Sequence, residues 1–496
     1  MSGTAESGIE TGQVLPPEEA FKVEQRGIDY IPAAERRGKP RDVFWMWTGT
    51  LVNVGYVVYG AVIISLGLSL AQAAAVILVG NLTYVLLGLA SLQGPQAGTS
   101  VFVITRAAFG HRGGQSVSFL NWLTQVGFEI EGLVLATLAA IAIVTKFGGN
   151  AGVGLKIVLI LVIAGMQLIL PLFGHATILQ VLKWMTLPFF ALFVILAILA
   201  APKLHLSAHP GASFATVAIA FAIVFSVTGL GWNYNGSDYT RYLPKETSQR
   251  AIFSWVTLSG FVPSTLMMFL GAFVATAVPA ASNPISGLPT VFSAWFLVPY
   301  LVVIIFQLLA GNCVVLYSSC LTLQAIGLKV KRYQAALIDT TFCAALTAVT
   351  VFSNKFNTLL GDFLLFIIVW AAPWTAIYLV DWALRRGQYR SADLLADRGG
   401  LYWRSDGWNI PAVIAQVLGM GASLLAIDTS VFVGPLSKAA GGADFSAFMG
   451  LAVGGLAYYV LARSRVRAEI GANAASSAVP GGRVAGAVSP ADPGLS

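Results

Sequence analysis

The sequence predicts an all-α integral membrane protein with twelve transmembrane helices. Of its 496 residues, 57% are hydrophobic and only 10% are charged, whereas ordinary globular domains carry about 25% charged residues. The apolar residues form long runs separated by short polar stretches, and they do not alternate with polar residues as they would in a transmembrane barrel. Because lipid offers no hydrogen-bond partners to the backbone, helices are the expected spanning elements.

The apolar runs set the expected spans. Runs long enough to cross about 30 Å of hydrocarbon lie at 43–67, 70–92, 115–146, 153–173, 176–200, 213–236, 250–278, 292–327, 334–353, 356–384, 408–429 and 445–462. They divide the chain into an N-terminal tail (1–42), a first five-helix repeat (43–200), a second five-helix repeat (213–384), a loop (385–407), two additional helices (408–465) and a C-terminal tail (466–496). The last tail is rich in Ala, Gly, Ser and Pro, a composition that predicts disorder.

The basic residues predict the orientation. Lys and Arg concentrate in alternate loops and in both tails, so the positive-inside rule places both termini in the cytoplasm of a multi-pass protein of the plasma (inner) membrane. This distribution explains the net charge of +7 without a nucleic-acid partner. The expected partners are the lipid bilayer and a small-molecule solute, and we expect a monomer.

Neither catalysis nor metal binding is indicated. Cys313, Cys320 and Cys343 lie in apolar stretches at spacings that fit neither a zinc site nor a disulfide framework, and the four histidines are scattered. A membrane-embedded enzyme would need a nucleophile with a base, or a cluster of metal ligands. We therefore expect no enzyme activity, no catalytic residue, no metal and no cofactor other than a co-transported ion.

The first and sixth spans are interrupted by glycine and polar residues. The first reads WTGTLVNVGYVVYG (47–60), and the sixth ends in FSVTGLGWNYNG (225–236). Glycine weakens a helix by about 1 kcal/mol relative to alanine, although small residues also let membrane helices pack closely. Because these spans open successive five-helix repeats, the matched interruptions indicate an inverted-repeat transporter that binds its substrate between two broken helices.

Polar residues in the third and eighth spans mark the expected site. Gln125 and Glu129 are one helical turn apart with Phe128 beside them, and Glu131 points elsewhere. A carboxylate inside the membrane indicates a substrate contact or a proton site, with a structural pair to a neighbouring helix as the alternative for Glu131. Asn312 lies deep in the eighth span, as a substrate contact or a packing amide. Other carboxylates nearer the span ends are attributed to solvation at the interface: Asp339, Asp362, Asp381 and Asp428.

Four motifs follow one another along the chain: VEQRGIDYIP (23–32), GPQAGTSVFVITRAAFG (94–110), SDYTRYLP (237–244) and NCVVLYS (312–318). Together they resemble the nucleobase:cation symporter-1 family, and most closely its purine-cytosine permease branch. The resemblance implies a five-plus-five inverted repeat with two added helices, alternating access, and cation-driven import of a nucleobase or related planar heterocycle. It also implies that the base stacks on Phe128 and on an aromatic residue of the sixth span, while the amides of Gln125 and Asn312 read its edge.

Two departures from the family alter the expected pocket. Nine residues before Asp238, where some relatives carry the second stacking aromatic, this chain has Gly229, which leaves Trp232 and Phe225 as candidates. One turn after the span-three aromatic, many relatives have Asn where this chain has Gly132, with Glu131 next to it.

A third departure concerns the co-transported ion. Sodium-binding relatives carry Ser or Thr hydroxyls about one turn before the span-eight Asn, where this chain has Phe306 and Gln307. Without those hard oxygen ligands a proton is favoured over sodium, and Glu129 is the favoured carrier.

The prediction is thus a secondary active transporter that imports a cytosine-like or purine-like heterocycle with a proton. The predicted substrate-binding residues are Gln125, Phe128, Glu129, Thr228, Gly229, Trp232, Asn312, Asn53 and Gly55, and the predicted coupling residues are Glu129 and Glu131. On the cytoplasmic side, Asp238 and Arg241 are expected to pair across one helical turn. The open alternatives are an amino acid or vitamin-like cargo, sodium coupling and, from another class, a membrane-embedded enzyme.

Overall fold

The computed structural model describes residues 19–24, 26–203, 210–291, 295–353 and 356–478. These residues form a bundle of helices elongated in one direction, and the only β pairing among them is a single bridge between Asp428 and Val433. The all-helical fold class is therefore confirmed. The first and last parts of the two tails, 1–18 and 479–496, lie outside the described residues.

The helices of the first half are α2 (Pro40–Leu51), α3 (Val54–Ser65), α4 (Leu70–Asn81), α5 (Tyr84–Ala90), α6 (Gln93–Ala97), α7 (Val101–Ile104), α8 (Arg106–Phe109), α9 (His111–Lys146), α10 (Val153–Phe173) and α11 (His175–Ala200). The second half contains α12 (Phe214–Val227), α13 (Gly229–Trp232), α14 (Gly236–Thr240), α15 (Gln249–Ala277), α16 (Leu297–Ile326), α17 (Arg332–Ser353) and α18 (Phe356–Arg385). The chain ends with α19 (Ser391–Leu395), α20 (Ile410–Ala426), α21 (Pro435–Ala439) and α22 (Ser446–Ala478). Short 3-10 turns are η1 (Ala33–Glu35), η2 (Ala201–Lys203), η3 (Asn233–Asn235), η4 (Pro279–Ser282) and η5 (Leu288–Val291).

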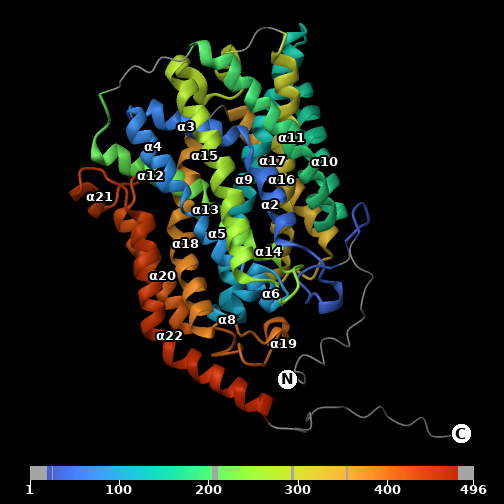
Figure 1. Cartoon of the computed structure of the whole chain (residues 1–496), viewed down its shortest axis with the longest axis vertical. Helices are drawn as coiled ribbons and strands as arrows, with labels where there is room; N and C mark the ends of the chain where they lie inside the picture. Colours follow the sequence, from blue (N-terminus) through green and yellow to red (C-terminus); the bar gives the residue numbers. More distant parts are fainter. Residues whose placement is uncertain (1–18, 25, 204–209, 292–294, 354–355, 479–496) are drawn as a thin grey trace, which may run out of the picture.

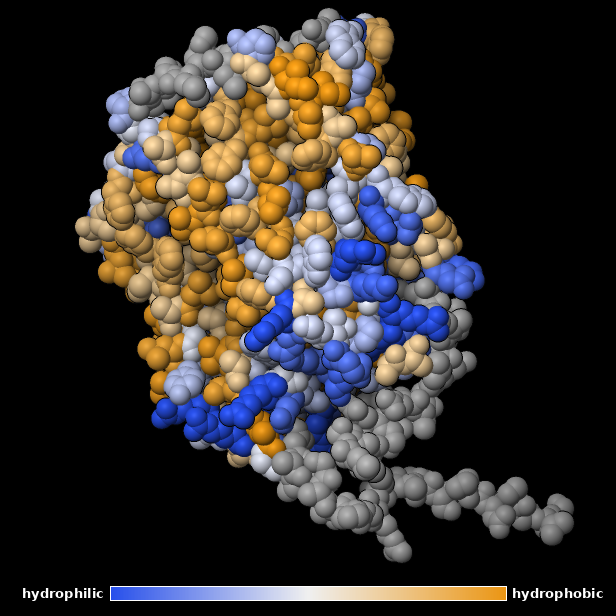
Figure 2. Space-filling view, in the orientation of Figure 1, coloured by the Kyte–Doolittle hydropathy of each residue, from blue (hydrophilic) through white to orange (hydrophobic). Residues whose placement is uncertain are grey.

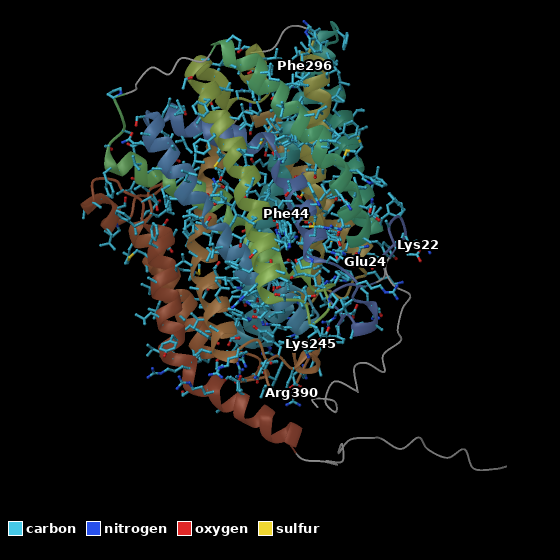
Figure 3. The ribbon with its side chains drawn as sticks, in the orientation of Figure 1. Lys22, Glu24, Phe44, Lys245, Phe296 and Arg390 are labelled. Atoms are coloured by element: carbon cyan, nitrogen blue, oxygen red, sulfur yellow. The ribbon has the colours of Figure 1, made fainter. Side chains whose placement is uncertain are left out.

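Ten helical segments among the described residues are long and apolar enough to cross a membrane, and the bent pair α2–α3 makes eleven. The apolar helix α20 has only 17 residues, so the predicted count of twelve is not confirmed by length and composition. Hydrophobic side chains cover most of the face shown in Figure 2, and hydrophilic ones gather toward its lower part. Lys245 and Arg390 both lie at this lower end (Figure 3).

The first predicted break is confirmed between α2 and α3, which are bent by 56°. Asn53 is extended and caps α3, its side chain accepting a hydrogen bond from the Gly55 N–H at 2.7 Å. Gln307 of α16 bridges the break: its amide donates to the Val52 carbonyl at 2.5 Å and accepts from the Val54 N–H at 2.8 Å. Backbone groups freed at membrane depth must be satisfied by protein or water, and here one glutamine satisfies two of them.

The second predicted break is confirmed at Thr228, where α12 ends in a non-helical conformation. The hydroxyl of Tyr56 donates to the Val227 carbonyl at 2.9 Å, and the Gly229 N–H donates to the Thr83 hydroxyl at 3.0 Å. A Cβ at Gly229 would collide with the Thr83 carbonyl. The break is therefore held by α3 on one side and by the turn before α5 on the other.

The predicted start of the C-terminal tail, at residue 466, is wrong. Instead of ending near 465, α22 continues to Ala478. The added turns carry Glu469, whose carboxylate pairs with Arg385 at 2.9 Å and with Arg404 at 2.5 Å. Alanine has the highest helix propensity, so this sequence can continue the helix, and the two ion pairs of Glu469 anchor the extension.

Candidate substrate cavity

A cavity of about 70 Å³ lies where the two broken helices meet α9 and α16. Its walls are formed by Thr50, Asn53, Gly55, Tyr56, Tyr59, Phe128, Glu131, Gly132, Leu135, Val227, Trp232, Leu308, Gly311, Asn312 and Val315. Since one water needs about 10–15 Å³ on this measure, the space admits a few water molecules or one compact solute. The structure thus brings spans one, three, six and eight together at this cavity, as predicted.

Two aromatic rings face each other across this cavity. The rings of Phe128 and Trp232 have centroids 6.4 Å apart and lie within 17° of parallel. The Trp232 indole donates to the Tyr56 hydroxyl at 2.8 Å, which fixes the orientation of the indole. Of the two sequence candidates for the second aromatic, Trp232 lines the cavity, whereas Phe225 packs against Phe448 of α22.

Polar groups occupy the cavity edge. The Glu131 carboxylate accepts a hydrogen bond from the Tyr59 hydroxyl at 2.9 Å. Asn53 uses its side-chain oxygen to cap α3, so its amide nitrogen is the group left for the cavity. Together with Asn312, these side chains offer both donors and acceptors at the rim of the aromatic pair.

Asn312 is held from behind by a hydrogen-bonded chain. Its amide nitrogen donates to the Glu129 carbonyl at 2.9 Å and to the Gln167 side-chain oxygen at 3.0 Å. Gln167 in turn donates to the Glu129 carboxylate at 3.2 Å. A Cβ at position 132 would collide with the Asn312 side chain. Gly132, noted above as a departure from the family, therefore makes room for the span-eight amide.

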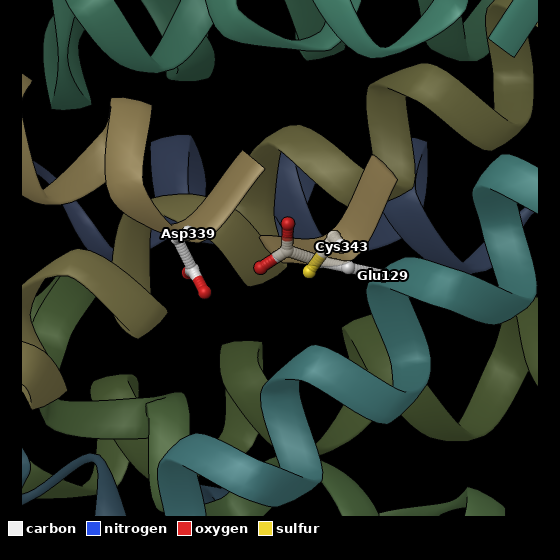
Figure 4. A group of neighbouring side chains, drawn as sticks. All are labelled: Glu129, Asp339 and Cys343. Atoms are coloured by element: carbon white, nitrogen blue, oxygen red, sulfur yellow. The ribbon is translucent and has the colours of Figure 1, made fainter. Parts of the chain in front are cut away.

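The predicted face of α9 is reversed. Phe128, Glu131, Gly132 and Leu135 follow the i, i+3, i+4, i+7 spacing of one helix face and line the cavity. Glu129 does not line it, and faces Gln167 of α10 with Asp339 and Cys343 of α17 (Figure 4). The expectation that Glu131 points elsewhere is thus wrong, because the polar face defined by Gln125 and Glu129 packs against protein.

The remaining predicted residues also lie outside the cavity lining. Gln125 donates to the Asn235 side chain at 2.5 Å. The Thr228 hydroxyl bonds to the Val224 carbonyl at 2.7 Å and to the Thr83 hydroxyl at 2.7 Å. Thr228 and Gly229 therefore face α4 and α5 and shape the break from behind. Asn53, Gly55, Phe128, Trp232 and Asn312 are the predicted residues that the structure brings together.

A second polar cluster lies toward the lower end and is built on Glu24 (Figure 3). The Glu24 carboxylate accepts from the hydroxyls of Tyr242 at 2.6 Å and Tyr317 at 2.9 Å. It also lies 3.6 Å from the Arg241 guanidinium and 3.7 Å from that of Arg332. Burial alone would raise the pKa of this carboxyl, but the two guanidinium groups, together with hydrogen bonds from Tyr242 and the His175 N–H, hold the pKa below its ordinary value. We call these five residues the lower seal.

The predicted pair of Asp238 and Arg241 does not form. The Asp238 carboxylate accepts from the Val101 N–H at 2.9 Å and so caps α7. Arg241 instead joins the lower seal and donates to the Gly27 carbonyl at 2.6 Å. The pair does not form because the carboxylate of Asp238 and the guanidinium of Arg241 are engaged by different partners.

The geometry can be compared with known proteins. A family model described as "Permease for cytosine/purines, uracil, thiamine, allantoin" matches residues 30–450. The chain belongs to this permease family. The resemblance to the purine-cytosine permease branch of nucleobase:cation symporters is thereby confirmed, and the protein is a transporter rather than an enzyme.

Individual relatives match most of the permease. The putative purine-cytosine permease YxlA of Bacillus subtilis is 32% identical, over 91% of this chain and 98% of the relative. The purine-cytosine permease fcyB of Emericella nidulans is 26% identical, over 89% and 88%. A vitamin B6 transporter of Saccharomyces cerevisiae is 24% identical, over 71% and 64%.

One solved structure establishes the fold. Mhp1, a nucleobase-cation-symport-1 family transporter in a closed conformation with bromovinylhydantoin bound, superposes with a TM-score of 0.72 at 17% identity. The match covers 92% of the permease and 100% of Mhp1.

Sequence reasoning missed three of the permease's polar side chains. Tyr56 and Tyr59 line the cavity. They are three residues apart in the helix that follows the break, and this spacing, which places them on one face, was the signal that could have found them. In the sequence, Gln307 stands out only because sodium-binding relatives carry a Ser or Thr hydroxyl near this position. In the structure, its side chain holds the first break. The buried carboxylates of Asp339 and Asp381 were wrongly attributed to interface solvation, since each is at most 2% exposed.

Proposed function

We propose that this permease imports a planar nucleobase-like heterocycle, cytosine-like or purine-like, by proton symport and alternating access. The observation that carries the proposal is the near-parallel pair of Phe128 and Trp232 at a cavity between the two broken helices. A flat solute between two rings needs a centroid spacing of about 7 Å, twice the about 3.5 Å of a carbon contact. The observed centroid distance is 6.4 Å, so the two rings must separate further to admit one planar ring between them.

The cavity edge suits a polar and uncharged ring. Glu131 offers acceptors, and the amide nitrogen of Asn53 offers donors. A site built to hydrogen-bond a substrate edge rejects analogues that leave its buried polar groups unpaired. The lining contains neither Arg nor Lys, which disfavours an amino acid, whose carboxylate would need a cation or a free helix N-terminus. The names of these relatives refer to purines, cytosine and vitamin B6. These compounds are planar heterocycles, which supports this class of cargo.

Gln307 supports a proton over sodium as the coupled ion. A sodium ion at the first break would need backbone carbonyls such as that of Val52 together with hydroxyl oxygens from α16. Here the Gln307 amide donates to that carbonyl, so an N–H group occupies a position where a cation would bind. Gln307→Ser, which restores a hydroxyl, should raise the sodium dependence of uptake if the break can accept the ion, and Gln307→Leu should not.

The lower end is proposed to face the cytoplasm of the plasma (inner) membrane. The support is the positive-inside pattern together with Lys245 and Arg390 at that end (Figure 3). The alternative that keeps the fold is a vitamin-like heterocycle as cargo, and the experiment below includes it.

The test is uptake into proteoliposomes of labelled cytosine, adenine, hypoxanthine, uracil, allantoin and pyridoxine, with the proton and sodium gradients collapsed separately. We expect at least one planar heterocycle to accumulate, and its accumulation to vanish only when the proton gradient is removed. Trp232→Ala should abolish this uptake, whereas Trp295→Ala, at a ring that is 69% exposed, should not. The proposal fails if no aromatic solute accumulates or if uptake ignores the proton gradient.

A further inference from the structure

Two buried carboxylates face each other behind the cavity. One oxygen of Glu129, one oxygen of Asp339 and the sulfur of Cys343 all lie within 4.8 Å of one another (Figure 4). Glu129 and Asp339 are both 0% exposed. One oxygen of each, Oε1 of Glu129 and Oδ2 of Asp339, has no hydrogen-bond partner. The unpartnered oxygens therefore belong to the two groups that point toward each other.

No positive charge among the described residues neutralises this pair. Neither carboxylate forms an ion pair with any of them, and the cation that approaches along α17, Arg332, is engaged by Glu24 two turns away. The other titratable groups that face the pair are the thiols of Cys343 on α17 and of Cys313 and Cys320 on α16. The helix α10 contributes only the neutral Gln167. Two like charges this close at a buried site cannot both persist.

The surrounding groups fit a proton better than a metal ion. The Trp122 indole donates to Asp339 Oδ1 at 3.0 Å, and Gln167 donates to Glu129 Oε2. These donors occupy one oxygen of each carboxylate, which leaves two oxygens and one thiol as ligands. A hard cation takes six or more oxygens. On α16, the hydroxyl of Ser319 is fully buried and interacts with the Asp339 carboxyl, so it can accept from or donate to a protonated carboxyl.

We propose that Glu129 and Asp339 form a proton-binding site in which one proton is held between the two carboxyl groups, and that this is the proton carried with the substrate. The inference rests on the proposed proton symport and names its site. The proton binds to one carboxylate oxygen from one side of the membrane and leaves to the other side, and no other covalent bond changes. Glu131, the cavity carboxylate, then contacts substrate and does not carry the coupled proton.

A hydrogen-bonded chain connects this proton site to the cavity. Asn312 lines the cavity and donates to Gln167, which donates to Glu129. A substrate that draws the Asn312 amide toward itself weakens the bond to Gln167, and thereby changes the donor that Gln167 presents to the carboxylate. Because coupling between two ligands is reciprocal, protonation of the pair must change substrate affinity by the same factor.

The test compares Glu129→Gln and Asp339→Asn with wild type in proteoliposomes that contain a pH indicator. We expect substrate-driven proton uptake to be lost in both variants, while substrate exchange by counterflow, which needs no gradient, is retained. Asp339→Glu keeps a carboxyl and should retain proton uptake. Asp444→Asn is the control that should behave as wild type, because it removes a buried carboxyl in the loop before α22.

A second readout does not depend on any variant folding. The infrared difference spectrum of wild-type protein with and without substrate should contain a protonated-carboxyl band, which Asp339→Asn shifts or removes where it folds. The inference is overturned if the band is absent, if Asp339→Asn keeps wild-type proton uptake, or if zinc or manganese binds in a manner that Cys343→Ser abolishes. If wild type itself moves no proton with substrate, the proposed function fails instead.

Discussion

Replacing Glu24 by Gln removes the negative charge of the lower seal, whose other members are two guanidinium groups and two tyrosine hydroxyls. The Glu24 side chain is 1% exposed, and Arg241 and Arg332 are buried with it. Removing one partner of a buried ion pair costs about 3–5 kcal/mol because the other charge stays buried and unpaired. The upper part of this range applies here, since two cations lose one anion and the Gln amide nitrogen would face the N–H of His175 or the guanidinium groups.

The cost has a pH dependence with a definite sign. The pKa of Glu24 is depressed in the folded protein, so its stabilisation is fully present above the ordinary glutamate pKa of about 4.3. It is lost as the pH falls through the depressed value. The difference in stability between wild type and Glu24→Gln should therefore be constant from neutral pH down to about pH 5 and should narrow at lower pH.

The assay is the temperature at which half of the purified protein stays monodisperse in detergent, measured across pH. Glu19→Gln is the matched control, because its partner Lys22 is an exposed neighbour, and it should leave this temperature unchanged. Glu24→Gln combined with Arg332→Gln should cost less than the sum of the single changes. Equal stability of Glu24→Gln and wild type at pH 7, or a difference that does not narrow in acid, would refute the electrostatic account of the lower seal.

Three other substitutions test the packing around the cavity. Gly132→Ala places a methyl group against the Asn312 side chain, and the lost hydrogen bond, worth about 0.5–1.5 kcal/mol, should lower kcat/KM for uptake by about two- to tenfold. Trp232→Phe keeps a ring but loses the bond to Tyr56; stacking worth about 1–3 kcal/mol per base should be mostly retained, so affinity measured by counterflow should fall far less than in Trp232→Ala. Gly60→Ala would drive a methyl group into the Met268 backbone, which should separate α3 from α15 and lower thermal stability, whereas Gly165→Ala, with open space around it, should not.

Much of the fold could be predicted because a helix that crosses the hydrocarbon of a membrane needs a long run of apolar residues. Both helix breaks follow from local residues, since Asn53 caps α3 and Gly229 permits close approach at the second break. The partner that satisfies the first break could not be predicted, because Gln307 lies more than 250 residues away and is read locally as an ordinary polar residue in a span. The extension of α22 depended likewise on ion pairs of Glu469 with residues of a distant loop and helix.

The candidate site was predicted in its residue types but not in its orientation. The helix α9 has polar residues on two faces, and the 3.6-residue period identifies each face without saying which one meets the cavity. The spacing of Gln125 and Glu129, one helical turn apart, predicts a shared polar face at the cavity. Only the packing of α10 and α17 against that face reveals that Glu131 is the cavity carboxylate. Asp339 was misjudged similarly, because distance from a span end does not measure burial when neighbouring helices extend farther.

The helix α16 connects the three polar networks. Gln307 holds the first break, Asn312 joins the cavity to Gln167, and Tyr317 belongs to the lower seal. Successive members are five residues apart, so each is rotated by about 140° from the last and displaced by about 7.5 Å along the axis. One buried helix thus presents a different network to each of three partners: the bent pair α2–α3, the helix α10, and the segment around Glu24. If the bend of α2–α3 changes while α16 stays packed on α9, the bonds of Gln307 must change first. Any coupling between the substrate and the lower seal can then pass along the contiguous residues of α16, and this requires α16 to stay rigid.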